Sequence, residues 1–138
     1  MKHAFALVLL FSAVCVLPAG AQKSQPTPAD SAKAKFAGTW EGTYQSDHAP
    51  DGGMRLTVAR DSVWKATLDI SADQPIPTRE VTDFEVDGNN VYWNQELMGM
   101  PCKSSAVLVD GTLKGETNCG HGGLTFTLRK KERAADSR

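Results

Sequence analysis

Two cysteines stand at equal distances on either side of a dipeptide that favours a tight β-hairpin turn. Asp110-Gly111 suits a two-residue type I′ turn, because both central positions of that turn need a positive φ angle. Counting outward from this turn places Cys102 directly opposite Cys119, in a non-hydrogen-bonded pair whose close α-carbons suit a disulfide. The sequence therefore predicts a hairpin register, a Cys102–Cys119 disulfide and an oxidising compartment.

The amino terminus has the order of a secretory signal peptide. Lys2 and His3 precede an uncharged apolar run over residues 4–17, and Pro18 and the small residues Ala19-Gly20-Ala21 follow it. We expect residues 1–21 to be removed and the mature protein to be secreted or periplasmic. The run is shorter than the roughly 18 apolar residues of a membrane helix, so no membrane span is expected after cleavage.

The mature chain divides into a linker, one domain and a tail. Residues 22–35 lack large apolar side chains and are expected to be a linker, although Thr27-Pro28-Ala29-Asp30 has the start pattern of a short helix. Residues 36–130 form the predicted domain. Residues 131–138 are polar and are expected to be a disordered tail.

Residues 36–130 show the period-two alternation that is typical of half-buried strands. Eight such segments follow one another between turn residues, and the fourth covers about residues 80–86. Strands joined in sequence by tight turns form an antiparallel meander, and closing the meander covers its apolar face and both edges. The expected fold is an all-β, eight-stranded antiparallel up-and-down β-barrel, with a β-sandwich as the alternative.

The charge balance and the cysteine count exclude some partners. Removal of Lys2 leaves 14 of the 15 basic side chains against 16 acidic ones. These charges are interspersed, so nucleic acid is not an expected partner. A structural zinc site needs several His or Cys ligands, and the disulfide leaves only His48 and His121 after the signal peptide. No metal and no cofactor are therefore expected.

The motifs that suggest catalysis are weak. Ser46-Asp47-His48 holds all three residue types of a catalytic triad, but adjacent residues in a loop do not line up nucleophile, base and orienting carboxylate. Ser and Asp are common turn residues, so a polar turn is the preferred interpretation. The sequence has no glycine-rich phosphate loop and no paired-carboxylate motif. We do not expect an enzyme.

Two short motifs at the ends of the domain carry a family resemblance. Gly38-Thr39-Trp40 at the start of the first strand and Arg129 at the end of the last resemble the opening and closing residues of the calycin barrels, which include lipocalins and fatty-acid-binding proteins. Residues 36–130 also resemble small barrel modules of exported bacterial proteins, some of which precede a serine-hydrolase domain. The resemblance implies a lipocalin-like barrel, and in lipocalins the tryptophan and the arginine pack together at the closed end.

The inner face of such a barrel is the expected ligand site. Small eight-stranded barrels are either filled by side chains or hold one small ligand, and here bulky inner residues face small ones such as Gly42 and Gly115. Gln95 is the expected polar handle, unless its amide bonds instead to Ser104, Thr117 or Tyr44. The candidate ligand-binding residues are Met54, Trp64, Leu68, Trp93, Gln95, Ala106 and Phe126.

Two classes of function follow from this interpretation. The first is an exported lipocalin-like barrel that binds a small hydrophobic or amphipathic ligand. The alternative is a protein-interaction or accessory module of the cell envelope with a filled core, including one associated with a hydrolase. Such a module would act through loops such as residues 44–53 and 97–101. The second of these loops contains Met98-Gly99-Met100-Pro101, and methionine side chains adapt to varied partners.

Overall fold

The structure is a computed structural model that describes residues 25, 27–71 and 75–132. The predicted signal peptide, residues 1–21, and residues 133–138 of the predicted tail lie outside the described residues. The expected division of the chain therefore stays a prediction at both ends. No helix within the described ranges is long and apolar enough to cross a membrane.

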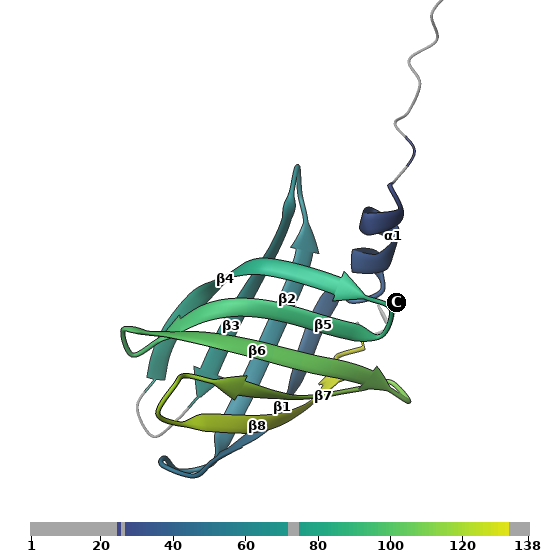
Figure 1. The fold of residues 1–138 in the computed structure, drawn as a ribbon. Helices are drawn as coiled ribbons and strands as arrows, with labels where there is room; N and C mark the ends of the chain where they lie inside the picture. The colour runs from purple at the N-terminus through teal and green to yellow at the C-terminus, as the bar shows by residue number, and fades with distance from the viewer. Residues whose placement is uncertain (1–24, 26, 72–74, 133–138) are drawn as a thin grey trace, which may run out of the picture.

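Eight antiparallel strands close into one barrel, in which each strand pairs with its neighbours in sequence and β8 pairs with β1 (Figure 1). This confirms the predicted fold class, and the alternative sandwich is not formed. A short helix, α1 (Pro28–Ala34), precedes the barrel. The strands are β1 (Gly38–Ser46), β2 (Gly52–Arg60), β3 (Trp64–Ser71), β4 (Pro75–Asp87), β5 (Asn90–Leu97), β6 (Met100–Val109), β7 (Thr112–Asn118) and β8 (Gly123–Lys130).

The β6–β7 hairpin has the register that the sequence predicts. Its pairs run from Val109 opposite Thr112 to Lys103 opposite Asn118, and Cys102 and Cys119 form a disulfide one step further on, with α-carbons 4.2 Å apart. The Cys119 N–H donates to the Gly122 carbonyl at 2.9 Å, so it does not bond across to Cys102. The predicted disulfide and its non-hydrogen-bonded position are both confirmed.

The core fills the inside of the barrel, because alternate residues of every strand point inward. The predicted inner residues Trp40, Met54, Leu68, Trp93, Leu113 and Phe126 are buried, and Trp64 and Leu108 are partly buried against the same core. Each fully buried large side chain of this kind contributes about 1.5–3 kcal/mol. The barrel interior is therefore the main source of stability.

The helix α1 lies beside one end of the barrel (Figure 1). Thr27 and Asp30 cap it reciprocally, which confirms the predicted helix start. Its Asp30 accepts a hydrogen bond from Trp64 Nε1 at 2.9 Å, and the following Phe36 is buried and accepts from Trp40 Nε1 at 2.9 Å. The helix is thus tied to β3 and to β1 through two tryptophan side chains.

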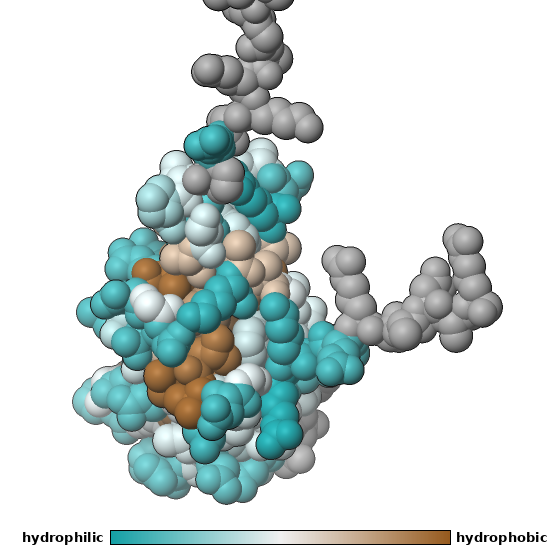
Figure 2. Space-filling model, turned by 90° about the vertical axis from the view of Figure 1, so that its right-hand side faces the viewer, coloured by the Kyte–Doolittle hydropathy of each residue, from teal (hydrophilic) through white to brown (hydrophobic). Residues whose placement is uncertain are grey.

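The tryptophan–arginine packing of lipocalins is not formed at this end, because strand alternation turns Arg129 outward. Arg129 is exposed on the outside of β8, opposite Glu41 and Thr112. The neighbouring Lys130 instead places its ammonium 5.6 Å from the centre of the Trp40 ring. Figure 2 looks onto this end and shows apolar side chains gathered there below the helix.

Candidate ligand site

The two strands β4 and β5 separate toward the end of the barrel opposite α1. Their pairing runs from Asp87 opposite Asn90 to Thr82 opposite Asn94, with a bulge between Thr82 and Glu85. Asp83 in this bulge has φ 51°, and its carboxylate accepts a hydrogen bond from Asn94 Nδ2 at 2.8 Å. A β-bulge of this kind bends a strand and ends its regular pairing, and bulges are common beside functional sites.

A recess of about 770 Å³ lies beyond the last β4–β5 pair. Its lining includes outward polar residues of both strands, such as Glu80, Thr82 and Glu96. It also includes Gln95 and Cys102, which are 5% and 1% exposed and belong to the inner wall. The recess therefore lies on the outer surface of the sheet, and two of its lining residues belong to the buried wall of the barrel.

Arg79 is an inward-facing charged residue that the sequence interpretation missed. It lies opposite the buried Leu68 in the β3–β4 ladder, and opposite residues of an antiparallel pair share one face of the sheet. Its neighbours Thr78 and Glu80 are exposed, as alternation requires, and Thr78 donates a hydrogen bond to Asp69 on the outer face. Arg79 Nε is buried and has no hydrogen-bond partner among the described residues.

Trp93 provides a second buried donor. It belongs to β5, whereas Arg79 belongs to β4, the other of the two separating strands. Its side chain is 1% exposed and packs against Phe126 and Phe84, with ring centres 5.7 and 6.4 Å away. Within the part of the chain that the structure describes, Trp93 Nε1 has no hydrogen-bond partner. A buried donor without a partner costs about 1–3 kcal/mol and calls for an explanation such as a ligand or a bound water.

Gln95 belongs to a buried polar cluster with Ser104 and Thr117. Ser104 Oγ donates to Gln95 Oε1 at 3.0 Å and lies 2.6 Å from Thr117 Oγ1, and Gln95 Nε2 donates to Thr117 Oγ1 at 3.5 Å. The sequence left open whether Gln95 serves a ligand or bonds to neighbouring side chains. The second arrangement is the one observed. One of the two amide protons of Gln95 is directed at Thr117 Oγ1, over the long distance of 3.5 Å.

The wall of small residues on β6 and β7 is filled by an aromatic ring. A Cβ built on Gly115 would lie 2.5 Å from Phe126 Cζ and 2.6 Å from Ala106 Cβ. The phenyl ring of Phe126 therefore occupies the space that Gly115 leaves open, next to Ala106. These small residues therefore leave no free volume for a ligand. The candidate site is accordingly sought on the β4–β5 side of the barrel.

The seven predicted ligand-binding residues all belong to the core cluster or its polar part. Six are buried on the inner wall, namely Met54, Leu68, Trp93, Gln95, Ala106 and Phe126. Trp64 is partly buried and lies at the α1 end, where its indole N–H donates a hydrogen bond to Asp30. Contact of these residues with a ligand stays a prediction.

The Ser46-Asp47-His48 motif lies at the start of the β1–β2 loop, at the end of the barrel opposite α1, where the sequence predicts a polar turn. Ser46 Oγ donates to the Gly123 carbonyl at 3.4 Å and accepts from the His48 backbone N–H at 3.3 Å. Its hydroxyl is thus used by the turn itself. No group of three or more His, Cys, Asp or Glu side chains that could hold a metal ion is found in the described residues.

Comparisons with known proteins return structural similarities alone. No protein-family model matches the sequence, and no curated protein matches it. Among solved structures, the chain is similar to a fatty acid transporter named REP1-NXSQ, with 12% identity over 73% of this chain and 99% of that chain and a TM-score of 0.48. It is also similar to the wild-type fluorescent protein UnaG, with 14% identity over 71% of this chain and 98% of that chain and a TM-score of 0.46.

Proposed function

We propose that this protein is an exported carrier or sensor that binds a small amphipathic molecule. The apolar body of the ligand lies against the inner wall beside β4 and β5, and a head with hydrogen-bond-accepting oxygens faces Arg79 and Trp93. An anionic head, such as a carboxylate, fits a guanidinium best because the resulting hydrogen bonds are charge-assisted.

The observation that carries this proposal is the pair of buried donors without partners, Arg79 Nε and Trp93 Nε1. Buried polar groups in folded proteins are almost always hydrogen-bonded, so both donor nitrogens call for an acceptor. The Arg79 side chain as a whole is half-buried. The two donors come from β4 and β5, the strands that flank the recess of about 770 Å³, although neither Arg79 nor Trp93 lines the recess itself. A ligand that enters between these strands would supply acceptors to both donors.

Export is supported by the Cys102–Cys119 disulfide, since disulfides persist mainly in oxidising compartments. The predicted signal peptide over residues 1–21 leads to the same location. A carrier or sensor outside the cytoplasm is consistent with the absence of a recognised catalytic motif in the sequence, and we do not propose an enzymatic activity.

The test compares a long-chain fatty acid with the alcohol of the same chain length. Binding is followed by tryptophan emission and confirmed by native mass spectrometry of the exported protein. We expect the wild type to bind the acid more tightly than the alcohol. Arg79→Gln should weaken acid binding by about tenfold or more, the equivalent of one charge-assisted hydrogen bond, and should leave alcohol binding unchanged.

Arg55→Gln is the matched control, because Arg55 projects from the outer face of β2 toward Glu41. It should bind both probes like the wild type. Equal affinity of Arg79→Gln and the wild type for the acid would contradict the role of Arg79. If neither probe binds the wild type at micromolar concentration, the ligand-binding proposal is wrong and the interaction module with a filled core replaces it.

A further inference from the structure

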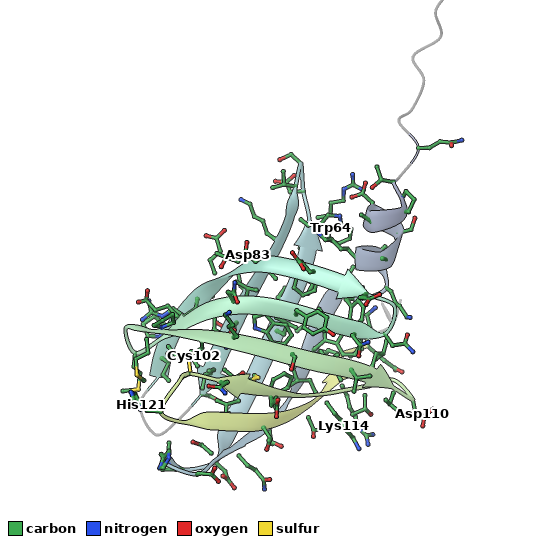
Figure 3. All side chains as sticks on the ribbon, in the orientation of Figure 1. Trp64, Asp83, Cys102, Asp110, Lys114 and His121 are labelled. Atoms are coloured by element: carbon green, nitrogen blue, oxygen red, sulfur yellow. A yellow bond between two sulfur atoms is a disulfide. The ribbon has the colours of Figure 1, made fainter. Side chains whose placement is uncertain are left out.

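Both histidines of the described residues and both exposed methionines lie at the same end of the barrel. His48 is in the β1–β2 loop, Met98 is in the β5–β6 turn with Met100 directly after it, and His121 is in the β7–β8 turn. In an up-and-down barrel these three connections share one end, and Figure 3 shows His121 beside Cys102 at the end opposite Asp110. The remaining described methionine, Met54, is buried in the core.

The β5–β6 turn holds its methionine in an unfavourable backbone conformation. Leu97 pairs with Met100, and the two residues between them, Met98 and Gly99, have φ angles of 52° and 77°. A two-residue turn with positive φ at both positions favours Asn, Asp or Gly, and a bulky residue there is an outlier. Met98 nevertheless occupies it and is 80% exposed, and Met100 is 43% exposed. Core packing does not explain an apolar side chain at this position.

The disulfide brings the methionine turn and the histidine turn together. Met100 precedes Cys102 by two residues, and His121 follows Cys119 by two residues. The Cys102–Cys119 bond therefore fixes the bases of both turns side by side, and Pro101 and Gly120 line the same recess. His48 lies close by, because a Cβ built on Gly122 would be 3.0 Å from its Cδ2.

We propose that Met98, Met100 and His121 form a binding site for a soft monovalent cation such as Cu(I). Thioether sulfur is a soft ligand that selects Cu(I) over harder cations, and imidazole also suits copper. The flexible methionine side chains can bring their sulfurs onto one ion held against the imidazole, since each has three rotatable bonds. The exposed position allows a cation to be taken up and released from solution. Its ligands differ from the Arg79 and Trp93 side chains of the proposed ligand site, although both sites border the same recess.

The experiment titrates the folded, oxidised protein with Ag⁺ in chloride-free buffer. Ag⁺ stands in for Cu(I) because it has the same preference for soft ligands and needs no reductant, which could open the Cys102–Cys119 disulfide. Calorimetry gives the affinity, and the methyl signals of the methionines in ¹H–¹³C spectra show where Ag⁺ binds. We expect one Ag⁺ to bind and to shift the Met98 and Met100 signals while Met54 stays unchanged.

Three variants separate this site from non-specific binding. The double variant Met98→Leu, Met100→Leu keeps the size and apolar character of both side chains but removes the sulfurs, and His121→Gln removes the imidazole. Each should weaken Ag⁺ binding by at least about tenfold, whereas Met54→Leu should bind like the wild type. Undiminished binding by the double variant, absence of Ag⁺ binding by the wild type, or equally effective competition by Zn²⁺ would overturn the proposal.

Discussion

The backbone of Gly42 in β1 lies so close to Thr127 in β8 that a Cβ on Gly42 would stand 1.9 Å from the Thr127 carbonyl oxygen. These two strands close the barrel, with Gly42 opposite Leu128 in the ladder. The contact involves backbone atoms that cannot rotate away as a side chain would. The closing seam of the barrel therefore depends on a residue without a side chain at this position.

Gly42→Ala is expected to destabilise the protein by about 1–3 kcal/mol or more, because the methyl group must push β1 and β8 apart. Thr43→Ala is the matched control, since Thr43 is the next residue of the same strand and is exposed. Urea unfolding of both variants measures the free energy of unfolding. A Gly42→Ala variant as stable as the wild type would mean that the two strands are further apart than the structure has them.

The disulfide gives a second prediction, which tests the hairpin register. The Cys102–Cys119 bond closes a loop with a sequence separation of 17 residues. In the chain-entropy model a loop of this size stabilises by about 3 kcal/mol. The double variant Cys102→Ser, Cys119→Ser should lose about that amount in urea unfolding and keep its β-sheet circular dichroism. Thiol titration of exported wild-type protein should find no free thiol at these positions, and two reactive thiols would contradict the register.

The contact between helix α1 and the barrel should depend on pH. The hydrogen bond from Trp64, together with those from Thr27, lowers the pKa of Asp30 below its ordinary value of 3.8. Arg60 adds to the effect from 3.7 Å. A carboxyl group whose pKa is lowered on folding stabilises the folded state above its ordinary pKa, and this contribution is lost as the pH falls through the lower pKa of the folded protein.

Asp30→Asn keeps an oxygen for Trp64 Nε1 but carries no charge at any pH. The wild type should therefore be more stable than this variant at neutral pH, and the difference should shrink as the pH falls below about 4. Thermal unfolding over a pH series measures both proteins. Trp64→Phe removes the largest cause of the lowered pKa and should reduce the same pH dependence. A difference between the wild type and Asp30→Asn that stays constant down to the lowest pH would contradict this assignment.

The sequence predicts the barrel because strand alternation and turn chemistry act locally. Asp110-Gly111 alone determines the β6–β7 register, and alternation places residues such as Trp40 and Trp93 inside. The bulge in β4 was not predictable from the same signals, since Asp83 with a positive φ interrupts the alternation. The predicted fourth strand also starts too late, at about residue 80 and not at Pro75, because the prolines of residues 74–77 favour a connection. Arg79 therefore lies just before the predicted strand. Counting back from the buried Val81 would have placed Arg79 inside.

The sequence also could not show whether the small inner residues leave a cavity, because that depends on which neighbouring group fills the space beside them. Gly42 makes room for a carbonyl group and Gly115 for the ring of Phe126. The same composition would also suit an open pocket. Lys130 and not Arg129 contacts the Trp40 ring, because Lys130 lies opposite Trp40 in the β1–β8 ladder and Arg129 lies opposite Glu41.

The last prediction concerns Ala106, a predicted ligand contact on this filled wall. Ala106 is 6% exposed, and its Cβ lies next to Gly115 and the Phe126 ring. Ala106→Phe adds a ring where no space remains, so it should destabilise the protein by about 1–3 kcal/mol. Val107→Phe is the control, because Val107 is the adjacent residue of β6 and is 38% exposed on the outer face. It should unfold like the wild type in urea. If Ala106→Phe instead keeps full stability and blocks fatty acid binding, the ligand occupies the β6–β7 side of the barrel and not the side of Arg79.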